Sequence, residues 1–196
     1  MANLKRSNTT AYRLGLVGLI LLVAMAANYG YWIEQIRYYL GITEESDELS
    51  SVRLQPNELY IPSLGIRTPI IFTDKTDNKS HQEALKNGVV RYPGTAEIGE
   101  KGNPYIFGHS SNYPWVKSNH NTVFALLPKI ELGSKIYATN SKGKVFTYYV
   151  QSTAVIKPSE TTYLDQYDHK RRMLTLQTSY PIGTALKRFI VIAEMR

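Results

Sequence analysis

Two side chains of reactive type lie where the sequence predicts strand ends. His109 follows the strand-like run YIFG and precedes the polar run SSN, so its imidazole could take up or release a proton at a barrel mouth. Ser179 follows MLTLQT and precedes Tyr180-Pro181, a pair that stops a strand ladder. Each has a plainer reading: a histidine that satisfies backbone groups, and a serine in a turn.

Arg188 is the third candidate. It opens the strand-like run RFIVIA, nine residues after Ser179, beyond a loop that contains Gly183. Two strands joined in this way can lie antiparallel, which would bring Arg188 back beside Ser179. Its guanidinium donors could then bind a developing oxyanion. The alternative is a surface arginine whose stem lies over the barrel wall.

Short runs rich in β-branched and aromatic residues follow Pro56, and Pro, Gly and Asn interrupt them. They predict strands at residues 59–61, 68–72, 89–92, 105–108, 135–140, 144–156, 173–177 and 188–193. Short helices are predicted at 80–86, capped by Ser80, and at 122–127. We expect an all-β fold closed into an eight-stranded barrel, because closure removes exposed strand edges.

Two of the connections have features of their own. Residues 140–143 predict a hairpin turn, with Gly143 free to adopt positive φ. Residues 157–172 predict a long exposed loop, a kind of segment that is often functional.

The N-terminal region predicts a membrane anchor. Residues 14–33 carry no charge, and a helix of that length would cross a hydrocarbon layer of about 30 Å. Lys5, Arg6 and Arg13 precede it, which places the N-terminus in the cytoplasm. We therefore expect a cytoplasmic segment 1–13, a signal anchor 14–33, a stalk 34–56 and an exported barrel 57–196. The anchor would cross the plasma membrane once, with the barrel on its outer side. A cleavable signal peptide, cut near Ala24-Met25-Ala26, is the alternative.

Composition excludes several chemistries. The chain has no cysteine, which rules out a cysteine nucleophile, disulfides and thiolate metal sites. Without the three basic residues before the anchor, 20 basic side chains face 16 acidic ones, too small a surplus to indicate nucleic-acid binding. Glu160, Asp165 and Asp168 match no defined calcium loop, so we expect no metal and no cofactor. His120 is a reserve base, and His169 reads as solvated.

The run YIFGHSS followed by TLQTSYPIGTALKRFIV resembles the signature of the sortase family. That signature has a strand ending in Gly-His, later a strand ending in TLxTC, and then an arginine on the next strand. Upstream, LYIPSLGIRTPIIF and GVVRYPGTAEIGEKGN are also similar, so the resemblance covers residue 59 to the C-terminus. It implies a sortase-type barrel in which His109 and Arg188 are catalytic and Ser179 occupies the cysteine position.

In that family the cysteine thiolate attacks the Thr-Gly bond of an LPxTG-like sorting signal, and an amine resolves the thioacyl enzyme. The resemblance implies sorting-signal-bearing surface proteins as partners, with an amine acceptor on the envelope or on a pilin. It also places Thr175 and Thr178 near the bound peptide. Trp115 is a candidate wall of the peptide groove, or else part of the core.

Serine in place of cysteine changes the chemistry. A thiol titrates near 8.5 and a neighbouring cation can hold it ionised, whereas a hydroxyl needs a base within about 2.6 to 3.2 Å. We therefore expect little or no transpeptidase activity. Ser179 is explained equally by a natural serine variant and by deliberate replacement of a cysteine. A non-catalytic peptide-binding module on the same barrel, or a structural barrel without a peptide site, are the other functions considered.

Overall fold

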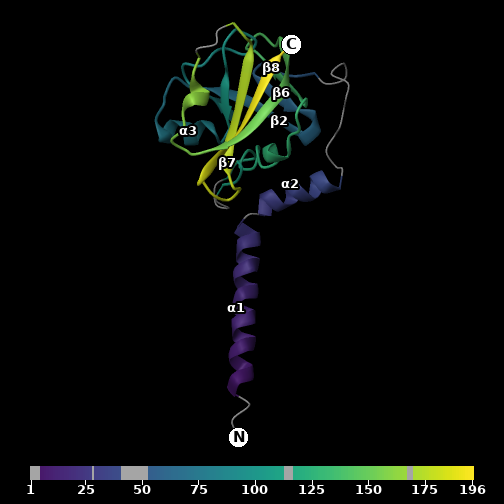
Figure 1. Cartoon of the computed structure of the whole chain (residues 1–196), viewed down its shortest axis with the longest axis vertical. Helices are drawn as coiled ribbons and strands as arrows, with labels where there is room; N and C mark the ends of the chain where they lie inside the picture. The colour runs from purple at the N-terminus through teal and green to yellow at the C-terminus, as the bar shows by residue number, and fades with distance from the viewer. Residues whose placement is uncertain (1–4, 28, 41–52, 113–116, 167–169) are drawn as a thin grey trace.

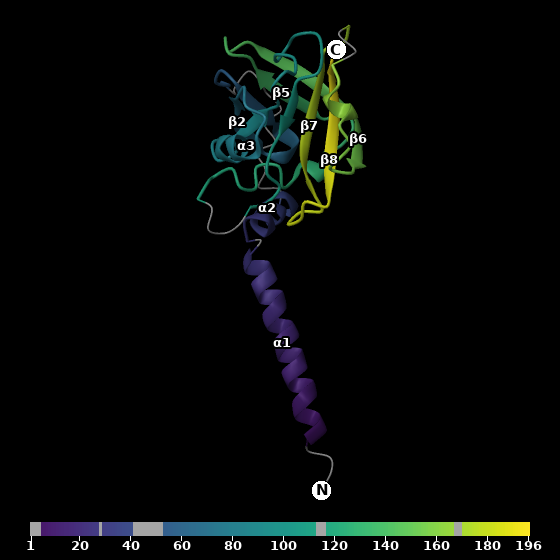
Figure 2. The ribbon, with the colours of Figure 1, turned by 90° about the vertical axis from the view of Figure 1, so that its left-hand side faces the viewer.

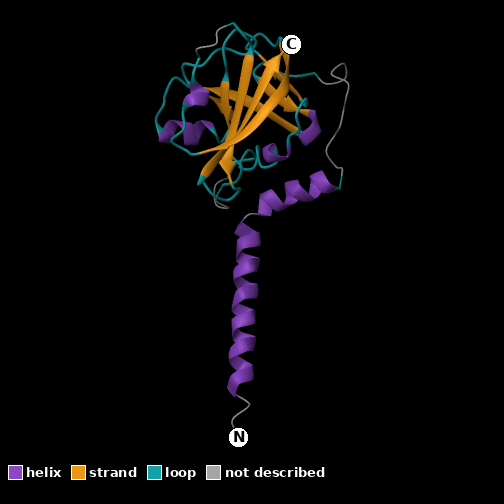
Figure 3. Cartoon of the chain, viewed as in Figure 1, coloured by secondary structure: helices purple, strands orange, loops and turns teal. Residues whose placement is uncertain are grey.

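A computed structural model describes residues 5–27, 29–40, 53–112, 117–166 and 170–196 of the chain. Strands form one compact body, and two helices precede it in the chain (Figures 1 and 3). Trp115, Asp168 and His169, singled out from the sequence, lie outside the described residues.

Eight strands close into a barrel, as the strand pattern predicts. They are β1 Glu58–Ile61, β2 Ile66–Phe72, β3 Val89–Arg91, β4 Tyr105–Phe107, β5 Lys135–Thr139, β6 Val145–Ile156, β7 Met173–Tyr180 and β8 Lys187–Met195. Their order around the barrel is β1-β2-β3-β4-β7-β8-β6-β5. The β2–β3 and β4–β7 pairs are parallel, and the other pairs are antiparallel. Figure 2 shows β7 and β8 running side by side along the wall.

Alternation along the strands separates the core from the outer wall. On β7, Leu174 and Leu176 belong to the hydrophobic core cluster, whereas Gln177 and Ser179 are only partly buried. Ile106 of β4 and Val191 of β8 join the same core. Successive side chains of a strand point to opposite faces, so Gln177 and Ser179 share the outer face of the barrel.

The short helices differ from the sequence-based expectation. Helix α3 covers Asn78–Ala84, and its N-cap is Asp77, whose side chain accepts a hydrogen bond from Ser80 N (3.0 Å), so Ser80 is not the cap. The helix expected at 122–127 is instead a series of turns that leads into the 3-10 helix η2, Leu127–Lys129. The reason is tertiary, because Phe124 N donates to His109 O (2.8 Å) instead of to a carbonyl one turn earlier. Two further 3-10 helices are η1, Pro62–Leu64, and η3, Thr162–Leu164. Of these two, η3 lies within the predicted long loop 157–172.

The N-terminal region forms helix α1, Lys5–Ala27, and helix α2, Tyr29–Tyr39. The two are bent by 77° relative to each other, so the straight span expected at 14–33 is divided. Within the described residues, neither helix alone has the length and hydropathy to cross a membrane, although the bent pair together meets that test by length and composition. Part of the predicted stalk belongs to α2. Within α2, Gln35 is buried and Tyr38 packs against the core cluster.

Candidate active site

Strand pairing places Ser179 directly beside Arg188. The two residues are cross-strand partners in the antiparallel β7–β8 pair, next to the loop in which Gly183 has a φ of 80°. Side chains of such partners lie on the same face, with Cβ atoms about 5 Å apart. The antiparallel pairing of Ser179 with Arg188, predicted from their nine-residue spacing, is therefore confirmed.

His109 reaches the same end of the barrel through the parallel β4–β7 pair. Gly108 N donates to Gln177 O on β7 (3.0 Å), and Phe124 N donates to His109 O (2.8 Å). A Cβ atom at Gly108 would lie 2.7 Å from Phe124 Cδ2 and 2.9 Å from Val89 Cγ1. Only glycine fits before the histidine, because the barrel wall is packed tightly around that peptide.

The three candidate catalytic residues line one groove. His109, Ser179 and Arg188 border a cavity of about 270 Å³. Tyr105, Phe107 and Gln177 form part of its barrel wall, while α3 and residues 158–164 form much of the remainder. Residues from four segments far apart in the sequence thus meet at one surface.

Tyr105 and Gln177 were not singled out from the sequence, yet they lie in this groove. The Tyr105 hydroxyl donates to Gln177 Oε1 (2.6 Å). Burial raises the pKa of Tyr105, and the nearby Arg188 cation opposes that shift, so the phenol stays protonated at neutral pH. Strand alternation could have revealed them, because Tyr105 pairs with Thr175 and Gln177 lies two residues before Ser179.

The environment of His109 favours its neutral form. Burial lowers the pKa of His109 below its usual 6.5. Asn112 Nδ2 lies 3.4 Å from His109 Nε2 and donates to Asn121 Oδ1 (3.0 Å). When Asn112 donates to Nε2, the ring carries its proton on Nδ1. Asn112 is therefore the side chain placed to contact the imidazole at Nε2, and it was not singled out from the sequence.

The contacts of Ser179 and Arg188 are sparse. In the part of the chain that the structure describes, no hydrogen bond involves the Ser179 hydroxyl, so His109 does not activate it in this arrangement. Arg188 Nη1 donates to the carbonyls of Ala185 and Lys187, each at 3.1 Å. These contacts hold the guanidinium against its own loop.

The two threonines expected near the substrate lie elsewhere. Thr178 is fully buried, and its hydroxyl donates to Gly108 O (2.9 Å), which supports the peptide before His109. Thr175 is also buried, donates to Asn103 Oδ1 (2.9 Å) and lines a separate cavity of about 210 Å³. Thr178 faces the barrel interior, opposite to Ser179, because neighbouring residues of a strand point to opposite faces.

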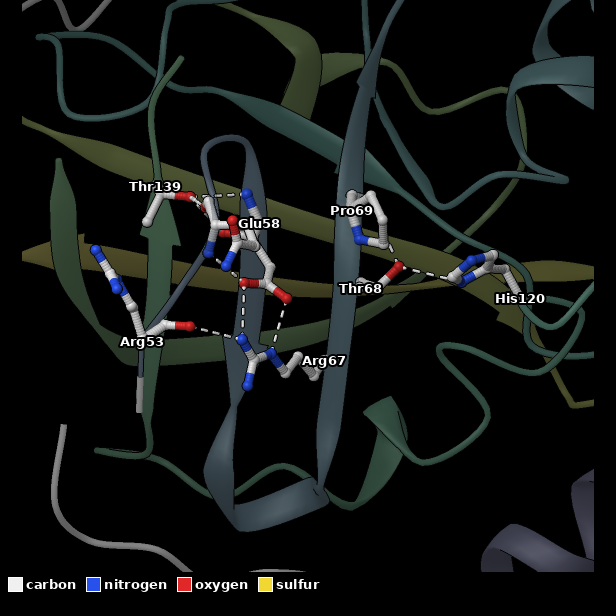
Figure 4. A network of polar contacts seen from close by, with 8 residues as sticks. Arg53, Glu58, Arg67, Thr68, Pro69, His120 and Thr139 are labelled. Carbon is white, nitrogen blue, oxygen red and sulfur yellow. Dashed lines mark hydrogen bonds and ion pairs between the residues drawn. The ribbon is translucent and has the colours of Figure 1, made fainter. Parts of the chain in front are cut away.

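The remaining polar candidates are outside the catalytic arrangement. His120 Nδ1 lies 3.3 Å from Thr68 Oγ1 (Figure 4). His120 lines a different cavity, together with Glu34 and Arg67. Glu160 borders the groove, and hydrogen bonds from Thr162 lower the pKa of its carboxyl. Among the residues with described positions, no three His, Asp or Glu side chains gather as metal ligands would.

Comparisons with known proteins agree with this geometry. The family model for the sortase domain matches residues 59–196, which is more than half of the chain. No curated protein matches by sequence.

Solved sortase structures share the fold. Sortase C-1 from Actinomyces oris is 25% identical, with a TM-score of 0.58 over 81% of this chain and 81% of that one. Sortase E from Streptomyces avermitilis is 28% identical, with a TM-score of 0.56 over 72% of this chain and 88% of that one. A Clostridium perfringens sortase D5 transpeptidase, 24% identical, gives 0.59 over 83% and 92% and supports the fold alone. With the family model matched across the whole barrel, this chain belongs to the sortase family.

Proposed function

We propose that the barrel is a transpeptidase domain that binds an LPxTG-like sorting signal in the groove and transfers it to an envelope amine. We further propose that activity is strongly impaired while position 179 is serine. The observation that carries the proposal is the meeting of His109, Ser179 and Arg188 in one groove. Its acceptor is an amine of the cell envelope or of a pilin, and its donors are surface proteins that bear the signal.

The groove supplies the groups that acyl transfer needs. The Ser179 oxygen would attack the carbonyl carbon of the scissile Thr-Gly bond, and Arg188 would stabilise the oxyanion that forms. Neutral His109 would accept the hydroxyl proton and return it to the leaving amine. A second amine would then attack the ester, release Ser179 and complete the transfer.

Impairment follows from the contacts of the nucleophile. General-base assistance requires the serine hydroxyl and the imidazole to lie within about 3.2 Å of each other. Asn112 faces His109 Nε2 instead, and the Ser179 hydroxyl has no bonded base among the described residues. A thiol at this position would need less help, because Arg188 on the paired strand favours a thiolate.

The same observation favours a second function, a binding module that holds sorting signals without turning them over. The groove and Arg188 would still recognise the peptide, whereas the unassisted hydroxyl would leave it intact.

We place this domain at the outer face of the plasma membrane. The support is α1, whose apolar side chains Leu14, Leu19, Leu22 and Val23 are exposed.

The decisive experiment restores the nucleophile. The full-length Ser179→Cys variant, the parent chain and Ser179→Ala are incubated in lipid nanodiscs with LPxTG-like peptides and a glycine peptide. We expect a covalent adduct only with Ser179→Cys. We expect exchange by that variant to be faster than by the serine form by on the order of 10²-fold or more, the scale of general-base assistance. The chain has no other cysteine, so mass spectrometry assigns the adduct to position 179.

Other outcomes separate the alternatives. Saturable peptide binding without exchange in all three proteins supports the binding module, and neither binding nor exchange contradicts both functions. Robust cleavage by the parent chain that Ser179→Ala abolishes would contradict the proposed impairment.

A further inference from the structure

Helix α2 turns its polar side toward the barrel. Gln35 is 6% exposed, and Glu34 lines the cavity between α2 and the barrel, together with His120 and Arg67. At Gly30 a Cβ atom would lie 3.0 Å from Thr122 Cγ2, so glycine permits close approach of the helix. On the same side, Tyr38 packs against the core cluster.

The opposite side of α2 is apolar and exposed. Tyr29, Trp32, Ile36, Tyr39 and Leu40 are 68%, 43%, 52%, 71% and 67% exposed. At 100° per residue, the five side chains fall within one stripe of about 100°. We call this stripe the aromatic face. A helix on a water-exposed surface normally buries its apolar stripe, whereas α2 leaves this one exposed.

Continuity with α1 indicates what covers the aromatic face. The apolar side chains of α1 are exposed, and they include Leu16, Val17, Ile20 and Met25 in addition to the four named above. Such a surface calls for lipid around it. This placement requires that α1 is inserted upright in the bilayer, and it does not require that α1 alone crosses it. Because α2 leaves α1 at 77°, α2 then lies close to the bilayer plane. Tyr and Trp are the residues enriched at that depth.

Cations flank the aromatic face. Lys129 Nζ donates to the Tyr39 hydroxyl (3.0 Å) and lies 5.2 Å from the centre of that ring. The side chain of Arg37 is 58% exposed and pairs with Glu34 at 3.4 Å. Anionic lipid phosphates lie at the height where these two cations would meet them.

We propose that α2 is an in-plane interfacial helix whose aromatic face lies in the outer lipid headgroup layer, so that the barrel rests on the bilayer surface. This places the groove near the lipid, because the β7–β8 loop and α2 lie at the same end of the barrel in both views (Figures 1 and 2). The inference stands on α1 and α2 alone, independently of any transpeptidase activity.

Single spin labels test the proposal. The chain lacks cysteine, so Ile36→Cys and Val145→Cys each give one labelled site in the full-length protein. Val145 is a matched control, since it is an exposed apolar residue near the C-terminal end of the barrel, where Tyr148 pairs with Met195. The labelled chains are placed in phosphatidylethanolamine and phosphatidylglycerol nanodiscs. Collisions with apolar oxygen and with a polar nickel chelate are then measured by electron paramagnetic resonance.

At residue 36 we expect collisions with oxygen to outnumber collisions with the nickel chelate. At residue 145 we expect the reverse. A label at residue 36 that nickel reaches as readily as at residue 145 overturns the proposal, because α2 is then in water. A label that neither reagent reaches, with spin-spin broadening, also overturns it, because a second copy then covers the face. Leu40→Cys repeats the measurement at a second position of the aromatic face, in case a label at residue 36 disturbs folding.

Discussion

Two polar clusters on opposite parts of the barrel differ in how completely their groups are bonded. In the first, around Glu58 of β1, the carboxylate accepts from Arg67 Nε (2.7 Å), from Arg67 Nη2 (3.2 Å) and from Gln55 N (2.6 Å). The Thr139 hydroxyl accepts from Glu58 N (2.7 Å) and donates to Gln55 O (2.5 Å) (Figure 4). In the second, the groove, the Ser179 hydroxyl has no such partner among the described residues.

This difference separates support from function. The Glu58 cluster ties β1, β2 and β5 together, and its carboxylate already accepts three hydrogen bonds, which leaves that carboxylate little capacity to bind a ligand. The groove leaves a hydroxyl and a guanidinium facing a cavity. A hydroxyl that a fold leaves without a protein partner, beside a cation, indicates a place for a ligand.

The sharpest way to break this comparison is Arg188→Ala in the Ser179→Cys background. If Arg188 serves the reaction, kcat/KM for peptide exchange falls about 10²- to 10³-fold, the loss seen when one oxyanion donor is removed. The unfolding free energy changes by less than about 0.5 kcal/mol, because among the described residues the side chain bonds to carbonyls of its own loop alone.

Lys187→Ala is the control for Arg188. Lys187 is the neighbouring cation on β8, it is exposed, and its carbonyl, which binds Arg188, survives the substitution. The Lys187→Ala substitution should leave kcat/KM for peptide exchange nearly unchanged. Equal losses in the two variants would mean that the general positive charge of the hairpin matters, and that Arg188 has no special role.

The Glu58 cluster should show the opposite pattern. Glu58→Ala leaves Gln55 N and the Arg67 guanidinium without their main acceptor, and we expect a loss of about 2 kcal/mol in unfolding free energy. Urea denaturation measures the loss, with exposed Glu131→Ala as the control. Ser179→Ala in the same assay should cost less than about 0.5 kcal/mol. A Ser179→Ala loss as large as that of Glu58→Ala would remove the distinction between the two clusters.

The sequence predicts most of the barrel because strand alternation and turn residues are local signals. It places the strands within a few residues, and it pairs Ser179 with Arg188 through the short loop between them. Tertiary contacts decide what local signals miss. The helix expected at residues 122–127 is replaced by turns because His109 takes the amide of Phe124. The span expected at 14–33 is divided between α1 and α2, which are bent by 77° relative to each other, and α2 carries the buried side chain of Gln35.

The site was predicted less completely than the fold. His109, Ser179 and Arg188 could be found because each ends or begins a strand. Asn112 lies in a polar run where any of several residues could reach the imidazole, so its contact with His109 depends on the path of the loop. Thr178 could have been excluded from the groove by counting one residue back from Ser179, because neighbours on a strand face opposite ways.

The smallest effect that sharpens the comparison is the pH dependence of stability. Burial lowers the pKa of His109 in the folded state, so between that depressed value and 6.5 the unfolded chain binds more protons than the folded one. Unfolding free energy must therefore rise with pH through that window and level off above 6.5, as far as His109 is concerned. Urea titrations at several pH values should show a shallower rise for His109→Gln. His120, whose pKa burial also lowers, contributes to the same rise, so His120→Gln alone leaves part of the rise and the double variant flattens it further. A slope in His109→Gln equal to that of the parent would show that the groove does not penalise the charged imidazole, and the neutral base proposed for Ser179 would lose its support.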